Sequence, residues 1–203
     1  MDAVSFFLVQ HGQLHAAQGG ETSYSDRVFT GLSDDQMRRR PGASVNSLVW
    51  LLWHMARTED VSVNLVVADG RQVLDDTWTR RMNVPWRTNG TGMAESDAAE
   101  LTKRADLDGV RAYRAAVARR TREVVRGLRP EAWEETVVLA DTARAAAAGA
   151  FAPNTAWTEG VGYRPWQGHS RAAQLAGSAL RHNALHLGEA ITIRSLGGFA
   201  LGV

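Results

Sequence analysis

Apolar residues recur at the three- and four-residue spacing of an α-helix in several long segments of this chain. In the first of them, Val4, Phe7 and Leu14 lie on one helical line together with His11. The periodic segments cover residues 4–18, 45–69, 106–128 and 170–196. This spacing predicts an all-α protein built as a helical bundle.

Residues that favour helix ends stand at the borders of these segments. The candidates are Gly19-Gly20 after the first segment, Ser44 or Asn46 before the second, Asp106 or Asp108 before the third, and Ser170 and Gly197-Gly198 around the last. Ser33 predicts a further short helix through Arg39. The 203 residues fit a single domain, residues 1–203.

Two connections between the predicted helices are long. Residues 70–106 contain Pro85 and Asn89-Gly90, which predict a crossover with one short helix at about 97–104. Residues 135–169 are less regular and predict a short helix followed by a loop, which we expect to act as a lid or pocket wall. Such long crossover connections free the neighbouring helices from an antiparallel order.

Composition excludes several kinds of partner and chemistry. The formal net charge is +1, so nothing drives the chain globally toward nucleic acid or an anionic membrane. Residues 101–130 carry nine basic and three acidic side chains, which we interpret as a solvated helix face, with an anion or partner patch as the alternative. No apolar run is long enough for a membrane span. Cysteine is absent, so thiol chemistry requires an exogenous thiol, and we expect a cytoplasmic protein.

Three histidines have the spacing of a metal site. His182 and His186 lie one helical turn apart on the same face, so both can bind one ion. His54, in the second helical segment, is the best candidate for a third ligand, and three protein ligands leave a coordination position open. Asn183 follows the first histidine where zinc proteases of the HExxH type have glutamate, so that mechanism is not predicted.

His11 and His15 form a second pair with the same spacing. Gly12 between them lowers helix propensity, and no third candidate ligand lies near them in the sequence. We therefore favour a pocket-lining role for His11 over metal binding. His169 is interpreted as a loop or cap residue.

This chain resembles members of the DinB-like (DinB/YfiT) superfamily in the order of two motifs. These are NSLVWLLWHMARTED and HxxxHxGE, and the second is followed by LGG. The resemblance covers most of the chain and implies a four-helix bundle with a central metal, most often zinc or nickel. By this resemblance the ligands are His54, His182 and His186. Mycothiol-dependent maleylpyruvate isomerase is similar in layout but has glutamate where this chain has His182, and other relatives are thiol S-transferases. The superfamily also implies a homodimer.

The resemblance and the helical lines together suggest roles for further residues. Glu189 follows His186 by three residues, so it can orient that imidazole or move a proton, and His11 is a second candidate for proton transfer. Trp50 and Thr58 share the helical line of His54 and are predicted to bind cofactor or substrate, with simple core packing as the alternative for Trp50.

These observations predict an enzyme in which a divalent ion activates a thiol or a water molecule for reaction with a small-molecule substrate. Thiol-dependent S-transfer, with a thiol such as mycothiol, is the favoured reaction. The alternatives are hydrolysis of a small substrate and a non-catalytic, metal- or ligand-binding stress protein. Binding to nucleic acid or to a membrane is not expected.

Overall fold

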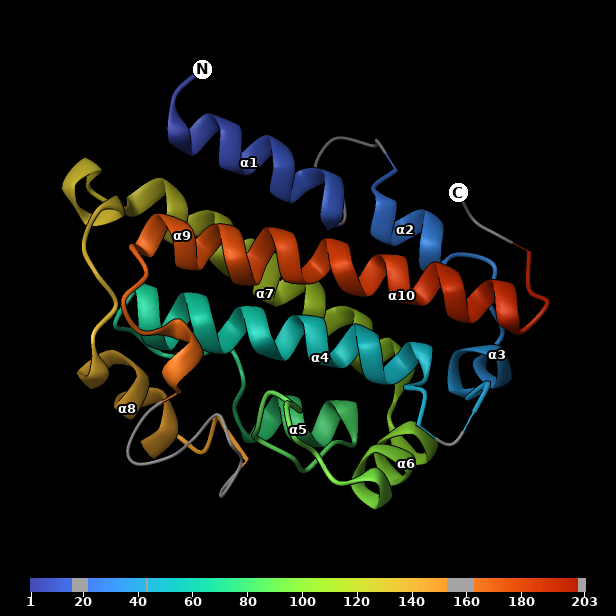
Figure 1. Cartoon of the computed structure of the whole chain (residues 1–203). Coiled ribbons are helices and arrows are strands. Elements are labelled where there is room, and N and C mark those ends of the chain that lie inside the picture. Colours follow the sequence, from blue (N-terminus) through green and yellow to red (C-terminus); the bar gives the residue numbers. More distant parts are fainter. Residues whose placement is uncertain (16–21, 43, 153–162, 201–203) are drawn as a thin grey trace.

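Four long helical rods lie alongside one another in the computed structural model, which describes residues 1–15, 22–42, 44–152 and 163–200 (Figure 1). The rods are α1 (Ala3–Leu14), α4 (Leu48–Asp60) continued by η1 (Val61–Val67), α7 (Leu107–Gly127), and α9 (Arg171–Leu175) continued by η4 (Ala176–Arg181) and α10 (His182–Leu196). Shorter helices cover the ends and one side: α2 (Tyr24–Phe29), α3 (Asp34–Arg38), α5 (Asp76–Met82), α6 (Glu95–Arg104), η2 (Pro130–Trp133), α8 (Leu139–Ala147) and η3 (Arg164–Trp166). Across the described residues there is no strand beyond one isolated bridge, so the predicted all-α, four-helix architecture is confirmed.

Side-chain caps start all four rods, and at the first of them the Asp2 carboxylate accepts from the N–H of Ser5. The N-cap oxygens of Ser47, Asp106 and Ser170 each accept a hydrogen bond from a backbone N–H in the first turn. Asp106 and Ser170 were predicted as caps, whereas the second rod begins at Leu48 and not at residue 45, because Ser47 and not Asn46 caps it. Gly198 has a left-handed backbone (φ +69°) after the last helix, as predicted.

The first rod is shorter than its apolar pattern. α1 ends at Leu14, and His15 has an extended backbone, while the rest of the predicted 4–18 segment lies outside the described residues. The ring of His15 instead contacts buried Glu59, with Nε2 2.7 Å from Oε2. A contact with a distant residue therefore ends the helix before the glycines that signal its end in the sequence.

Two short α-helices, α2 and α5, were not predicted. α2 begins at a capping box in which Ser23 and Asp26 satisfy each other's backbone N–H groups. α5 lies in the predicted crossover and begins where the Asp75 carboxylate accepts from the N–H of Trp78. Both signals are visible in the sequence, but each helix is too short for hydrophobic periodicity to detect. The predicted helix at 97–104 is present as α6.

The second and fourth rods each contain a stretch of wider π-helical turns, η1 and η4, and these stretches contact each other. Gln174 Nε2 and Ser178 Oγ both donate to Ser62 Oγ, at 2.7 Å each. A π-turn changes the direction in which the following side chains project from the helix, and such turns often accompany functional sites. η4 ends directly before His182.

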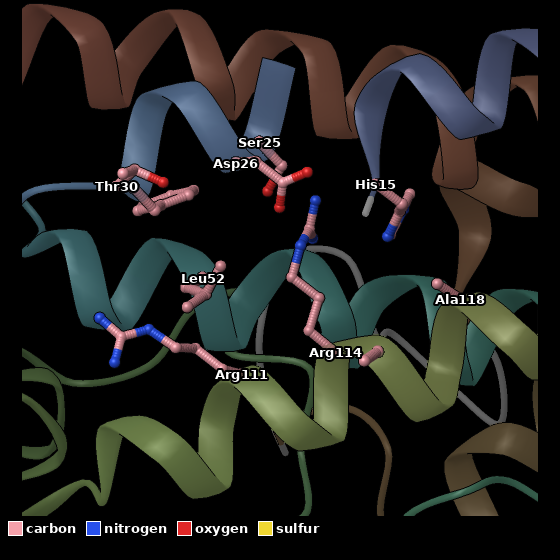
Figure 2. A pocket seen from close by; sticks show the side chains of 10 residues that line it. His15, Ser25, Asp26, Thr30, Leu52, Arg111, Arg114 and Ala118 are labelled. Atoms are coloured by element: carbon pink, nitrogen blue, oxygen red, sulfur yellow. The ribbon is translucent and has the colours of Figure 1, made fainter. Parts of the chain in front are cut away.

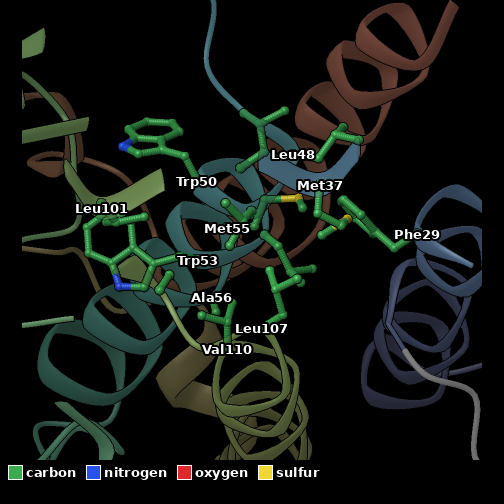
Figure 3. Packing of buried hydrophobic residues seen from close by; sticks show 14 of the residues in the cluster. Phe29, Met37, Leu48, Trp50, Trp53, Met55, Ala56, Leu101, Leu107 and Val110 are labelled. Carbon is green, nitrogen blue, oxygen red and sulfur yellow. The ribbon is translucent and has the colours of Figure 1, made fainter. Parts of the chain in front are cut away.

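α4 is the centre of the molecule. All thirteen of its residues are buried, and it packs against both α7 and α10. Figure 3 shows Trp53, Met55 and Ala56 of α4 packed against Leu107 and Val110, which begin α7. Because polar groups are costly to bury without partners, each polar side chain of α4 should serve a specific contact.

A buried ion pair on α4 holds the crossover in place. Arg57 Nη1 lies 3.0 Å from Asp60 Oδ2, and both side chains are fully buried. Asp60 accepts from the backbone N–H groups of Val73 and Leu74, and Arg57 Nη2 donates to the carbonyl of Arg87. The two ends of residues 73–87 are thus fastened to α4, which positions the loop that follows.

Among the described residues, none of the helices combines the length and the apolar character needed to cross a membrane.

Candidate metal centre

The three predicted ligands meet between α4 and α10. Nε2 of His54 lies 3.1 Å from Nε2 of His182, and one nitrogen from each of His54, His182 and His186 falls within a 4.8 Å cluster. The ring centroids lie 4.5–4.9 Å apart with the rings at steep angles to one another, so the rings converge edge-on and do not stack. This is the arrangement in which imidazoles present lone pairs to a common point.

The second nitrogen of two of these rings is held by an acceptor. His54 Nδ1–H donates to the carbonyl oxygen of Asn89 at 2.5 Å, and His186 Nδ1 lies 2.7 Å from Glu189 Oε2. A carbonyl or carboxylate oxygen beside Nδ1 fixes the proton there and leaves the Nε2 lone pair free. Histidines that bind metals are usually oriented in this way.

The loop at Asn89-Gly90 makes the contact to His54 possible. Asn89 is held by its N–H to the carbonyl of Ala150 (2.8 Å). Gly90 has φ +91°, and a Cβ there would stand 2.7 Å from Trp53 and 3.1 Å from His54 Nδ1. Only glycine fits this position. In the sequence, Asn89-Gly90 is recognisable as a turn signal but not as part of the site.

Burial keeps the imidazoles of His54 and His182 neutral. Burial, together with the smaller effect of the nearby His186, lowers the pKa of His54 to about 3. The pKa of His182 falls to about 2, again mainly through burial and then through the other two histidines. Neutral imidazole is the form that binds metal ions.

The donor set fits a divalent ion. Tetrahedral zinc with Zn–N bonds of 2.0–2.1 Å places ligand nitrogens about 3.3 Å apart, close to the observed 3.1 Å between His54 and His182. Within the described part of the chain, Nδ1 of His182 has no hydrogen-bond partner. With the His54 proton on Nδ1, two Nε2 atoms face each other with at most one proton between them, and a cation accommodates this arrangement. The histidine group could therefore hold a metal.

A cavity of about 260 Å³ adjoins the triad at His182. Thr58 lines it, as do Trp166 and His169 from the predicted lid segment and Arg181 from η4. Thr58 is buried, and its Oγ1 has no hydrogen-bond partner among the described residues, as expected of a group that serves a ligand. The end of the 135–169 segment is thus a pocket wall, whereas residues 153–162 lie outside the described residues.

Trp50 supports the site from behind. Its ring stacks on His54 with centroids 4.6 Å apart, and its Nε1–H donates to Met93 Sδ. It is 6% exposed and does not line the 260 Å³ cavity. The structure therefore places Trp50 as a packing partner of the imidazole.

His11 and His15 belong to a second cluster, whose third member, Glu59, was not predicted. Nε2 of His11 lies 2.9 Å from Glu59 Oε1, and Thr121 Oγ1 donates to the same oxygen at 2.6 Å. Burial by itself raises the pKa of Glu59, but the two imidazoles outweigh it and hold the pKa well below its ordinary range. Glu59 follows His54 by five residues, about 140° around the helix, so it faces α1 while His54 faces α10.

The second cluster is a hydrogen-bonded carboxylate. Arg122 Nη1 lies 3.4 Å from Nδ1 of His11, and because arginine only donates, that nitrogen accepts. The His11 proton is then on Nε2, where it donates to Glu59 and leaves no lone pair for an ion. Asn183 Nδ2 donates to the second oxygen of Glu59 at 3.1 Å. His11 is fully buried in this cluster, apart from the triad.

Fold and site together define a helical bundle with a histidine cluster suited to a metal ion, open to a cavity. The chain belongs to the DinB superfamily, whose family model matches residues 21–190. A crystal structure of a conserved protein from Enterococcus faecalis has the same fold: the TM-score is 0.64 at 17% identity, with 96% of this chain and 94% of that chain covered. A comparison with curated proteins gives no match.

Proposed function

We propose that this protein is a metal-dependent enzyme in which His54, His182 and His186 hold one divalent ion, zinc or nickel, and that it transfers an exogenous thiol to a small electrophile. The observation that carries the proposal is the convergence of three imidazoles beside a cavity, two of them oriented by oxygen acceptors. A bound divalent ion supplies positive charge that lowers the pKa of a thiol or water at the open position.

The thiol must come from outside the chain, since the sequence has no cysteine. A low-molecular-weight thiol such as mycothiol is the proposed co-substrate. In this proposal the substrate enters the 260 Å³ cavity, where the Thr58 hydroxyl provides a hydrogen bond. The homodimer implied by the superfamily remains a prediction.

We assign any proton transfer at this site to Glu189 and not to His11. The Glu189 carboxylate touches His186 and is partly exposed, so it can hold the ring and exchange protons with solvent. His11 is fully buried, and its ring is bound to Glu59. Trp50 is assigned to orienting the His54 ring.

The first test is elemental analysis of protein purified without chelators. We expect about one metal per chain in the wild type, consistent with one three-histidine site, and almost none in His54→Ala. His169→Ala is the matched control, because His169 lines the same cavity outside the triad and its loss should leave the metal in place. A wild-type protein without metal would overturn the proposal.

The second test combines a panel of thiols with a panel of electrophiles, assayed with and without metal. Turnover that requires both the metal and one particular thiol supports S-transfer. Metal-dependent hydrolysis without thiol would assign the site to the hydrolase alternative. A protein that retains metal but turns over nothing in either assay would be the non-catalytic alternative.

A further inference from the structure

A second cavity, of about 280 Å³, lies between α2, α4 and α7 (Figure 2). Its only residue from α4 is Leu52, two positions before His54 and so about 200° around the helix. None of the triad lines it. At this size, below the usual ~300–1,000 Å³ of ligand pockets, it suits one small molecule.

Arginines provide the positive charge of this cavity. Arg114 is 5% exposed, and in Figure 2 its guanidinium extends between Asp26 and His15. It donates through Nη1 to Asn183 Oδ1 (2.9 Å) and through Nη2 to the carbonyl of Leu14 (3.0 Å). Since a guanidinium has five N–H donors, these two bonds hold it in place and leave donors for a ligand.

The second arginine, Arg111, lies one turn earlier on α7 and is exposed, and it forms a surface ion pair with Asp108. A carboxylate that enters the cavity can therefore meet one fixed and one adjustable guanidinium. Guanidinium and carboxylate form strong, charge-assisted hydrogen bonds.

Acceptors face the same cavity. The Asp26 carboxylate lines it, and one of its oxygens, Oδ2, is already used by the Ser23 N–H and hydroxyl. His15 also lines the cavity and is 1% exposed. Neither ring nitrogen of His15 makes a hydrogen bond of normal geometry with the described residues, although Nε2 lies 2.7 Å from Glu59 Oε2.

The proximity to Glu59 assigns the His15 proton to Nε2 and leaves Nδ1 as a buried acceptor without a donor. Burial lowers the pKa of His15 to about 3, so the ring is neutral at pH 7. A buried acceptor without a partner costs free energy that a ligand N–H can offset. The cavity thus combines guanidinium donors with a carboxylate and an imidazole acceptor.

The remaining wall is mainly apolar, formed by Phe29, Leu52, Ala115 and Ala118, with the small polar residues Ser25 and Thr30 completing it. A simple anion would meet repulsion from Asp26, and a simple amine would meet two arginines. We propose that this cavity binds a small zwitterion of the α-amino acid class, with its carboxylate on Arg111 and Arg114, its ammonium on Asp26 and His15, and its side chain against the apolar wall. This site is independent of the proposed metal chemistry.

The test uses the full-length protein and isothermal titration calorimetry with L-leucine. Two matched probes each lack one charge: 4-methylpentanoate lacks the ammonium, and 3-methylbutylamine lacks the carboxylate. L-Leucine should bind at least about tenfold more tightly than either, because each lost charge leaves a charged or buried group without its partner. Equal binding of 4-methylpentanoate, or no binding of L-leucine, would overturn the proposal.

Substitutions at the cavity mouth locate the binding. Asp26→Asn and Arg111→Gln should each weaken L-leucine binding by about tenfold or more, and neither residue is in the buried core. Arg119→Gln, an exposed arginine on the same helix outside the cavity, is the matched control and should bind like the wild type. His54→Ala should also bind normally. If all variants bind L-leucine equally, the ligand does not occupy this cavity.

Discussion

His54 uses its two ring nitrogens for different purposes. Nδ1 is committed to the carbonyl of Asn89, and Trp50 stacks on the ring, so the imidazole has little freedom to rotate. Nε2 is directed at His182. The orientation of this candidate metal ligand is thus set by a backbone group 35 residues away.

Among the residues near the site that have no functional side chain, Gly90 should be the most sensitive to substitution. In Gly90→Ala the new methyl group would clash with Trp53 and His54, and the positive φ adds strain of about 1–3 kcal/mol. We expect lower stability in chemical denaturation and weaker metal binding. Gly31→Ala has the same kind of backbone (φ +72°) but open space, so it should lose stability without losing metal affinity. Equal effects in both variants would contradict the close-contact argument.

Glu189 tests whether the site depends on an oriented imidazole. Glu189→Gln removes the carboxylate that lies 2.7 Å from His186 Nδ1. Loss of such a partner weakens metal binding by about 10–100-fold. Because Glu189 is partly exposed, the fold should be retained. Competition with a chromogenic chelator measures the change, and an unchanged affinity would show that His186 needs no such support.

α4 distributes contacts around its whole circumference. His54 faces α10, Glu59 faces α1, and Arg57 with Asp60 faces the crossover. A helix buried on every side can position several sites at once, but each of its polar groups then requires a partner. This explains why the ionisable side chains of α4 lie in networks.

The Arg57–Asp60 pair should be important for stability. Asp60→Asn leaves Arg57 buried without a counter-charge and weakens the bonds to Tyr113, Val73 and Leu74. Breaking a buried pair on one side costs about 3–5 kcal/mol, which urea denaturation measures. The control is Asp108→Asn, because its exposed pair with Arg111 should contribute at most about 1 kcal/mol. A loss of similar size in both variants would refute a special role for the buried pair.

At the scale of the whole molecule, buried histidines link stability to pH. The folded-state pKa values of His15 and His54 are about 3, and that of His182 is about 2, against 6.5 in the unfolded chain. Below about pH 6.5 the unfolded state therefore binds more protons. Stability is complete above this pH and falls as the pH decreases toward 3.

The measurement is urea denaturation of metal-free protein between about pH 8 and pH 5, above the range in which most carboxylates titrate. Each neutral buried histidine should contribute a loss of up to about 1.4 kcal/mol per pH unit below pH 6.5. His54→Gln should reduce the slope of unfolding free energy against pH by the contribution of one proton, up to about 1.4 kcal/mol per pH unit. A slope that is the same in wild type and variant would mean that His54 titrates normally in the folded state.

The local sequence determined the helical class, most rod boundaries and the three candidate ligands. Caps such as Asp106 and Ser170, and the four-residue spacing of His182 and His186, act within one or two turns, so they can be recognised without the fold. The short helices α2 and α5 and the end of α1 were missed because their limits depend on brief caps or on the distant contact of His15.

Only the tertiary structure decided what surrounds those ligands. The Asn89 carbonyl has no signature in the sequence, because every residue carries one. Glu59 joins His11 across 48 residues, and His182 joins His54 across 128. Such contacts arise from the packing of rods against α4, and packing depends on the shape of the whole core rather than on local spacing. The sequence therefore determined which residues could bind a metal, and the fold decided how they are held and which cavities they face.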